Sequence, residues 1–219
     1  MGYDAIILDN EGVLTERTSS EVWRAAARAA FAAFDVDPTT EGIDSVVHGG
    51  LGRIRRVCDV HGVPAETFWP RHEACAAAAQ REALETGRKS LYDDVDALFD
   101  LDCDLAIVSN TQQRTVDHVV EAYDLAERFA VRYGREPTLD AVRLTKSSPH
   151  YLERALADLG VDSRDGTALY VGDSNVDVLA ARRAGIDSAF VRRPHRADYD
   201  LTAEPTYEID SLDDLAPLA

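Results

Sequence analysis

Polar side chains stand directly after the short apolar runs of this sequence, where buried parallel strands are expected to end. Ser109 and Asn110 follow one such run, and the acidic residues in equivalent places are Asp9, Glu11, Asp173 and Asp177. In an open parallel sheet, ligands bind outside the carboxyl ends of the strands, so residues far apart in sequence meet there. The sequence therefore predicts one crevice that contains four carboxylates.

Carboxylates held this close together need positive charge beside them, because they cannot all stay ionised alone. A divalent cation and a lysine would supply that charge, and Mg²⁺ favours oxygen ligands and phosphate substrates. Only two of the 23 basic residues are lysines, Lys89 and Lys146, so arginine is the default cation here. Lys146 lies between the second and the last of the polar segments. A site that needs a compact point charge gives a reason for lysine there, and we assign Lys146 to the site.

Strands and helices alternate along most of the chain, which is typical of an α/β fold with right-handed crossovers. Apolar runs predict strands over residues 5–8, 105–108, 129–133, 168–171, 189–191 and 207–209. Helices are expected over residues 21–34 and 149–159, and in segments that end near residues 123 and 185. We predict a doubly wound parallel sheet formed by residues 1–14 and 90–219. A small, mostly helical domain of residues 15–89 is inserted after the first strand.

Four segments, in a fixed order, carry a known pattern. They are the strand that ends in Asp9-Asn10-Glu11-Gly12-Val13-Leu14, then Ile107-Val108-Ser109-Asn110, then Lys146, then Val171-Gly172-Asp173-Ser174-Asn175-Val176-Asp177. With these motifs the chain resembles the haloacid dehalogenase superfamily, in its phosphatase branch, over nearly its whole length. The resemblance implies a Rossmann-like core with a helical cap between the first two motifs, similar to the phosphoglycolate phosphatase-like members.

The resemblance also implies a role for each matching residue. Asp9 is the nucleophile that attacks phosphorus and forms an aspartyl-phosphate, which water then hydrolyses. Ser109, Asn110 and nearby backbone N–H groups hold the phosphoryl oxygens, while Lys146 neutralises the nucleophile and the phosphate. The implied Mg²⁺ ligands are Asp9, Glu11 through its backbone carbonyl, Asp173 and Asp177, the last through water or by orienting Lys146. The implied reaction is Mg²⁺-dependent hydrolysis of a small organic phosphate.

One position departs from the family pattern, because the second acid of the first motif is normally Asp and here is Glu11. In the family this residue protonates the leaving group and later deprotonates the attacking water, which is typically worth ~10²–10⁴-fold. The extra methylene moves the carboxyl by about one bond length, and a displacement of that size can cost ~10²-fold. Glu11 leaves open a slow phosphatase, an altered substrate geometry, or a binding protein with little turnover.

A second enzymatic interpretation is 2-haloacid dehalogenation by the same Asp9 nucleophile. The dehalogenase branch has an aromatic residue in place of the second acid and lacks the metal-binding Gly-Asp. Glu11 and Gly172-Asp173 therefore favour the phosphatase over the dehalogenase.

The helical insertion contains arginines that could reach an anionic substrate from the cap. Arg53 is the residue we expect to do so, because it follows the glycine-rich turn of residues 48–52. The other arginines of the insertion are typical of the surface of amphipathic helices. We expect His72 to be structural and Trp69 to belong to the core of the cap.

Composition limits the classes of partner. The 219 residues are 45% hydrophobic, which predicts a packed core, and their formal charge of −17 would repel the phosphates of nucleic acid or of an anionic membrane. No apolar run approaches the ~20 residues that span a bilayer. We expect neither nucleic acid nor a membrane as a partner, but a small phosphorylated metabolite bound by a monomer or homodimer.

The charge is also spread evenly along the chain, with few lysines. This pattern favours a halophilic protein that works in molar salt, where charges are screened within ~3 Å, over an acidic patch for a cationic partner. The three cysteines are scattered and give neither a disulfide framework nor metal-ligand spacing. Together with a first segment that lacks a basic region, they predict a cytoplasmic protein.

Overall fold

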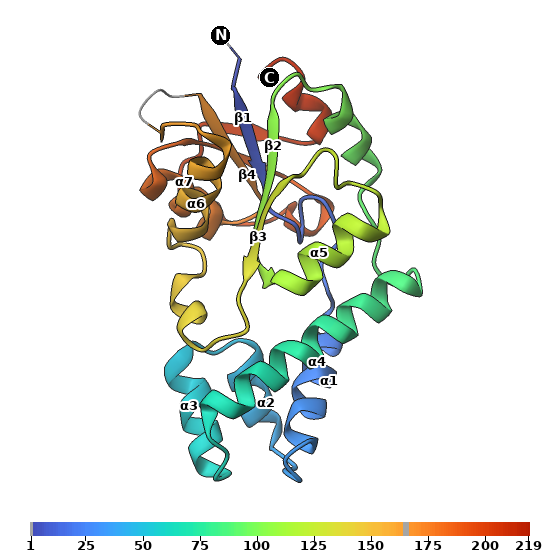
Figure 1. Ribbon diagram of the computed structural model, residues 1–219, viewed down its shortest axis with the longest axis vertical. Helices are drawn as coiled ribbons and strands as arrows, with labels where there is room; N and C mark the ends of the chain where they lie inside the picture. The colour runs from blue at the N-terminus through green and yellow to red at the C-terminus, as the bar shows by residue number, and fades with distance from the viewer. Residues whose placement is uncertain (1, 164–166) are drawn as a thin grey trace.

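A six-stranded parallel sheet forms the centre of the computed structural model, which describes residues 2–163 and 167–219 (Figure 1). Its order is β3-β2-β1-β4-β5-β6, and every neighbouring pair is parallel. The strands are β1 Ala5–Leu8, β2 Asp104–Gln112, β3 Val131–Arg135, β4 Ala168–Gly172, β5 Asp187–Val191 and β6 Tyr207–Ile209. Strands β1 and β4 are buried over their whole length, as expected for apolar runs that are covered on both faces.

The residues of β1 alternate between two hydrophobic clusters, one on each face of the sheet. Ile6 and Leu8 pack with α5, η1 and η5, whereas Ile7 packs with α6 and α7. These flanking elements are α5 Gln113–Ala122, α6 His150–Leu159, α7 Asn175–Ala184, and the 3₁₀ helices η1 Asp93–Asp100 and η5 Leu212–Leu215. Coverage of both faces confirms the predicted doubly wound α/β fold.

Four helices between β1 and η1 form a helical unit at one end of the sheet, drawn at the bottom of Figure 1. They are α1 Ser20–Ala32, α2 Thr40–Val47, α3 Leu51–Val60 and α4 Ala65–Glu85. Ser19 caps α1 with its hydroxyl, which accepts a hydrogen bond from the backbone N–H of Val22. The helices enclose a cluster of their own, to which the segment after β3 adds Leu139. On this basis we propose that residues 15–89 form a cap domain and residues 1–14 and 90–219 a core domain.

The two chain segments that connect the helical unit to the sheet lie side by side. Thr15 forms isolated β-bridges with Glu11 and with Leu91. The backbone N–H of Glu16 donates to the carbonyl of Ser90 at 2.9 Å. Glu11, within the first motif, therefore lies beside the point where the two linkers meet.

Strand β2 differs from the sequence prediction, in which residues 109–111 leave the strand and lead into a helix. In the structure β2 continues to Gln112, with a register shift against β3 between Val108 and Gln112. The side chain of Gln113 accepts a hydrogen bond from the backbone N–H of Gly134 at 2.7 Å, which ties this segment to β3. Strand β3 itself begins two residues later than predicted, because Phe129 packs into the core before the strand starts. No helix of residues 2–163 and 167–219 has both the length and the apolar character needed to cross a membrane.

Candidate active site

The register of the central strands brings three of the predicted residues to one edge of the sheet. Leu8 of β1 lies opposite Ile107 of β2 and Val171 of β4. Asp9, Ser109 and Asp173 follow these positions by one or two residues, and all three are buried. Pairing of the strands, and not proximity in sequence, builds the site.

A buried ammonium group joins two of the acids. Lys146 Nζ lies 2.8 Å from Asp9 Oδ2 and 2.8 Å from Asp177 Oδ1, and its side chain is 3% exposed. The hydroxyl of Tyr170 is a further neighbour, 2.7 Å from the same nitrogen. Burial alone would lower the pKa of Lys146, but the carboxylates of Asp177 and Asp9 outweigh it and raise this pKa. The lysine is therefore a fixed cation beside Asp9.

The Asp9 carboxyl has an unusual environment for an acid. Burial, with a further contribution from Asp177 and Asp173, raises the pKa of Asp9 to about 7, although Lys146 opposes the rise. Without further positive charge, the ionised and nucleophilic form of Asp9 is therefore less populated at neutral pH than that of an ordinary aspartate. A cation bound nearby would favour that form.

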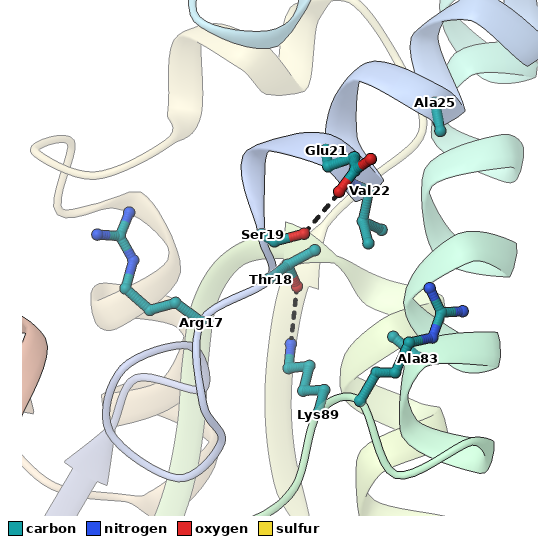
Figure 2. A pocket seen from close by; sticks show the side chains of 9 residues that line it. Arg17, Thr18, Ser19, Glu21, Val22, Ala25, Ala83 and Lys89 are labelled. Carbon is teal, nitrogen blue, oxygen red and sulfur yellow. Dashed lines mark hydrogen bonds between the residues drawn. The ribbon is translucent and has the colours of Figure 1, made fainter.

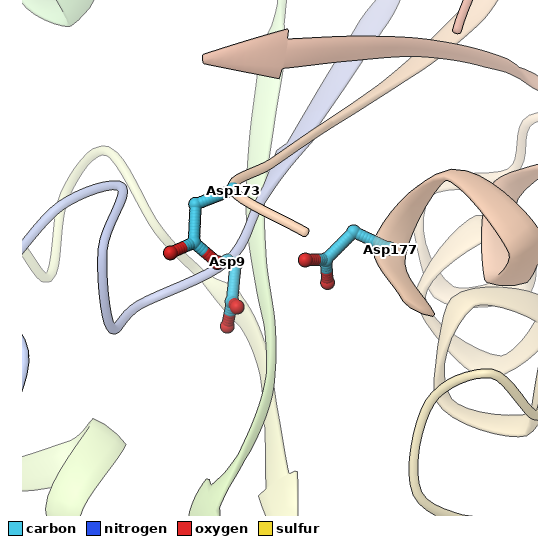
Figure 3. Close-up of side chains that lie close together, drawn as sticks. All are labelled: Asp9, Asp173 and Asp177. Carbon is cyan, nitrogen blue, oxygen red and sulfur yellow. The ribbon is translucent and has the colours of Figure 1, made fainter. Parts of the chain in front are cut away.

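Asp9, Asp173 and Asp177 form a cluster that suits such a cation. Each offers one carboxylate oxygen, and these oxygens lie within 4.8 Å of one another (Figure 3). Two glycines permit the approach, because a Cβ at Gly172 would lie 2.2 Å from the Cβ of Asp177, and one at Gly12 would lie 2.3 Å from Asp173 Oδ2. Carboxylate oxygens are the ligands that hard divalent cations such as Mg²⁺ prefer, so these residues fit the predicted ion.

Asp173 is held by two cationic or polar side chains from the segment after β5. His195 Nε2 lies 2.7 Å and Arg196 Nε 3.0 Å from Asp173 Oδ2. Burial alone would raise the pKa of Asp173, but His195 and Arg196 outweigh it and lower this pKa. Neither residue was expected from the sequence, since no motif or apolar period marks their segment.

The residues expected to hold the phosphoryl group lie beside the acids. Ser109 is buried, and its hydroxyl accepts a hydrogen bond from the backbone N–H of Thr111 at 3.2 Å. Asn110 Oδ1 accepts from the backbone N–H of Lys146 at 2.8 Å. Asn110 thus fixes the loop that carries the lysine, a positioning contact that the sequence did not reveal.

A cavity of about 520 Å³ lies between these core residues and the helical unit. Asp9, Glu11, Ser109, Asn110, Lys146, Asp173 and Asp177 all line it. The helical unit contributes His48, Trp69 and His72 to the lining, and the arginines in the lining are Arg17, Arg135 and Arg196. Arg53 is outside this lining and faces a separate hollow with Arg56. Trp69 and His72 are therefore buried, as expected, and they also line the cavity.

The Glu11 side chain forms an ion pair that the sequence analysis did not anticipate. Lys89 Nζ lies 2.6 Å from Glu11 Oε1, and the lysine side chain is 1% exposed. The scarcity of lysine, which pointed to Lys146, applies equally to Lys89. Both lysines of this chain are buried and contact an acid of the first motif.

A family model for haloacid dehalogenase-like hydrolases matches residues 3–185. Among characterised relatives, pyrophosphatase PpaX from Halalkalibacterium halodurans is 30% identical over 138 residues, which are 63% of this chain and 61% of that protein. Phosphoglycolate phosphatase 1 from Pseudomonas aeruginosa is 32% identical over 117 residues, or 53% of this chain and 41% of that protein. The chain thus matches less than two thirds of the length of either relative.

Solved structures share the whole fold at lower identity. CbbY from Rhodobacter sphaeroides, in complex with phosphate, is 23% identical with a TM-score of 0.72, over 97% of this chain and 96% of that chain. A HAD-superfamily hydrolase of subfamily IA from Geobacter sulfurreducens is 21% identical with a TM-score of 0.65, over 99% of this chain and 100% of that chain. These neighbours confirm the predicted fold. The family match over residues 3–185 shows that the chain belongs to the haloacid dehalogenase-like hydrolases.

Proposed function

We propose that the protein is a Mg²⁺-dependent phosphatase that hydrolyses a small organic phosphate through a covalent intermediate on Asp9. One observation carries this proposal: the Asp9 carboxylate, at the end of the central strand, lies 2.8 Å from a buried ammonium and within 4.8 Å of two further carboxylates. The names of the relatives, a pyrophosphatase and a phosphoglycolate phosphatase, support a phosphate substrate.

The reaction has two transfers at phosphorus. In the first, an Asp9 oxygen attacks the phosphorus atom, and the bond to the leaving oxygen breaks with its electron pair on that oxygen. In the second, water attacks the aspartyl-phosphate, the bond between phosphorus and Asp9 breaks, and inorganic phosphate leaves. When bound, Mg²⁺ would neutralise the phosphoryl charge and position the group for in-line transfer.

The surrounding residues serve these transfers. Lys146 offsets the charges of Asp9 and the phosphoryl group, and Asn110 holds the lysine loop in place. Ser109, buried at the end of β2, offers its hydroxyl to a phosphoryl oxygen. Glu11 lines the same cavity as Asp9 and would exchange a proton with water.

The test is phosphate release from a panel of small phosphates in molar KCl, with MgCl₂ or with a chelator. We expect Mg²⁺-dependent release that Asp9→Asn abolishes. Asp102→Asn, at an exposed acid near the opposite end of β2, is the matched control and should keep full activity. Chloride release from chloroacetate without metal would establish the dehalogenase instead. A folded protein that releases neither phosphate nor chloride, but gains activity in Glu11→Asp, would establish the binding protein.

We further propose that the enzyme works in the cytoplasm of a salt-adapted cell, as a monomer or homodimer. All three cysteines are free thiols, which suits a reducing compartment. Sedimentation in molar KCl would give the oligomeric state, and a species larger than a dimer would contradict this part of the proposal.

A further inference from the structure

The cavity beside the acids is larger than a phosphoryl group requires. Its volume of about 520 Å³ lies in the range of roughly 300–1,000 Å³ that is typical of sites for drug-sized ligands. Asp9, Ser109, Lys146 and Asp173 line the part that the core forms. The part that faces the helical unit is therefore left for the leaving group of the substrate.

The helical unit gives the cavity a mainly apolar wall. The described lining residues that belong to its helices are Ser20 and Trp23 of α1, Val46 and Val47 of α2, and Trp69 and His72 of α4. None of them is Asp, Glu, Lys or Arg, although 29% of the chain is charged. Trp69 and His72 stack with their ring centroids 5.0 Å apart. Both tryptophans of the chain thus line the cavity.

Three apolar or aromatic side chains of the cavity belong to none of the hydrophobic clusters of the described residues. They are Trp23, Val176 and Tyr199. Trp23 is partly exposed on the helical unit, and Val176, at the start of α7 in the core, is 40% exposed. The ring of Tyr199, in the segment after β5, stacks on Phe190 with centroids 6.0 Å apart. An apolar group bound in the cavity would remove part of this surface from water, which favours binding.

The arginines of the cavity leave little charge for a second anionic group. Arg135 donates to both carboxylate oxygens of Glu73, at 3.0 and 2.8 Å, and Arg196 is paired with an acid of the site. Among the residues that the structure describes, Arg17 forms no ion pair. It lies in the linker before α1, and its side chain points away from Lys89 (Figure 2). Arg17 is one free cation, which the phosphoryl group itself can use, and the helices add no lysine or arginine.

We propose that the wall around Trp23 and Val176 binds the leaving group, so that the enzyme favours phosphate monoesters whose leaving group carries an apolar ring over those whose leaving group carries a second anion. This inference rests on the proposed phosphatase function and narrows its substrate class. It sets the chain apart from compact anionic substrates such as pyrophosphate and phosphoglycolate, after which two of the relatives are named.

The decisive experiment measures the binding of phosphonates, which resemble phosphate monoesters but are not hydrolysed, because carbon replaces the bridging oxygen. Titration calorimetry in molar KCl with MgCl₂ gives Kd for benzylphosphonate, methylphosphonate and phosphonoacetate. Benzylphosphonate should bind at least ~10-fold more tightly than methylphosphonate, because its ring is buried, and more tightly than phosphonoacetate. It should also change the intrinsic fluorescence, because both tryptophans line the cavity.

Two results with the wild-type protein would overturn the proposal. One is a ratio between the Kd values of methylphosphonate and benzylphosphonate that is below ~10-fold. The other is tighter binding of phosphonoacetate than of benzylphosphonate, which would assign a second anionic group to the cavity.

Variants of the wall separate ligand binding from a structural role. Trp23→Ala should weaken benzylphosphonate by ~10-fold and leave methylphosphonate unchanged, whereas Trp23→Phe keeps a ring and should keep most of the preference. Val176→Ala should weaken benzylphosphonate by about 3-fold. Val60→Ala is the matched control, because Val60 is 75% exposed on α3 and does not line the cavity, and it should change neither Kd. An unchanged ratio in folded Trp23→Ala would overturn the proposal, and the wild-type ratio tests it even if that variant fails to fold.

Turnover separates this inference from the proposed function. The value of kcat/KM for 2-phenylethyl phosphate should exceed that for ethyl phosphate by ~10-fold or more, because the two leaving alcohols are similarly basic and differ in the ring. No phosphate release from any compound would overturn the phosphatase itself. Equal values for the two esters would overturn the preference for a ring and leave the phosphatase intact.

Discussion

Replacing Asp9 by Asn should stabilise the metal-free protein at neutral pH, because the native fold disfavours the ionised carboxylate. Burial, reinforced by Asp177 and Asp173, raises the pKa of Asp9 from 3.8 to about 7, against the opposing effect of Lys146. The unfolded chain ionises at the ordinary pKa. The stability that the protonated group contributes is therefore complete below about pH 3.8 and is lost as the pH rises through about 7.

The size of this effect follows from the two pKa values. At ~1.4 kcal/mol for each tenfold change in the ionisation constant, the difference corresponds to roughly 4 kcal/mol. Asn has nearly the shape of Asp and does not titrate, and Lys146 retains Asp177 at 2.8 Å as its counter-ion. The advantage of Asp9→Asn over the wild type should be small near pH 4, grow through about pH 6, and level off at a few kcal/mol near pH 8.

The assay is urea unfolding with a chelator at about pH 4, 6 and 8, in constant KCl, with Asp102→Asn as the control. Saturating MgCl₂ near pH 8 should reduce the difference, because the cation stabilises only the native state that contains the ionised Asp9. The reasoning is refuted if Asp9→Asn is no more stable than the wild type near pH 8, or if its advantage does not depend on pH.

Further predictions concern charge, binding and packing. Lys146→Met should lower kcat for phosphate release by ~10²-fold or more, since it removes the cation beside the nucleophile. Arg17→Gln should raise KM by ~10-fold, because Arg17 lines the cavity and no ion pair of the described residues occupies it. Arg53→Gln is the comparison, and a larger effect there would reinstate the cap contact expected from the sequence. Phe31→Ala, in the cap core, should cost ~3–5 kcal/mol in urea unfolding, whereas Phe99→Ala, 47% exposed, should cost less than ~0.5 kcal/mol. Melting temperature should rise with KCl concentration up to the molar range.

The sheet could be predicted from sequence because its central strands carry an unambiguous signal. Ala5–Leu8 and Ala168–Gly172 are buried on both faces, so they appear as continuous apolar runs. The end of β2 could not be predicted, because residues 109–112 are polar and extended for a tertiary reason. They pair with β3 after a register shift, and no local preference encodes that shift.

The candidate site likewise contains residues that could be predicted from the sequence and residues that could not. Asp9 and Asp173 lie at strand ends, where topology alone places functional residues. Lys89, His195 and Arg196 lie in linkers, and each reaches the site through a contact with a residue at least 22 positions away. Such contacts depend on how the linkers pack, which neither periodicity nor motif spacing reveals. The composition did contain a usable signal for Lys89. Only two of the 23 basic residues are lysines, so each lysine is a candidate for a role that arginine does not fill.

The lysines also bear on how a protein with a formal charge of −17 could bind the anionic substrate proposed above. Lys146 contacts Asp9 and Asp177, Lys89 contacts Glu11, and Arg196 contacts Asp173. Four carboxylates of the site thus contact three fixed cations, and Arg17 lines the same cavity. The divalent cation proposed for the site would add positive charge there, so that a phosphoryl group could bind where the rest of the protein would repel it. In molar salt, as proposed, the charge of the acidic surface would be screened within ~3 Å and would contribute little inside the cavity. In the function proposed above, a cation at the site and molar salt at the surface would each offset part of one acidic charge distribution.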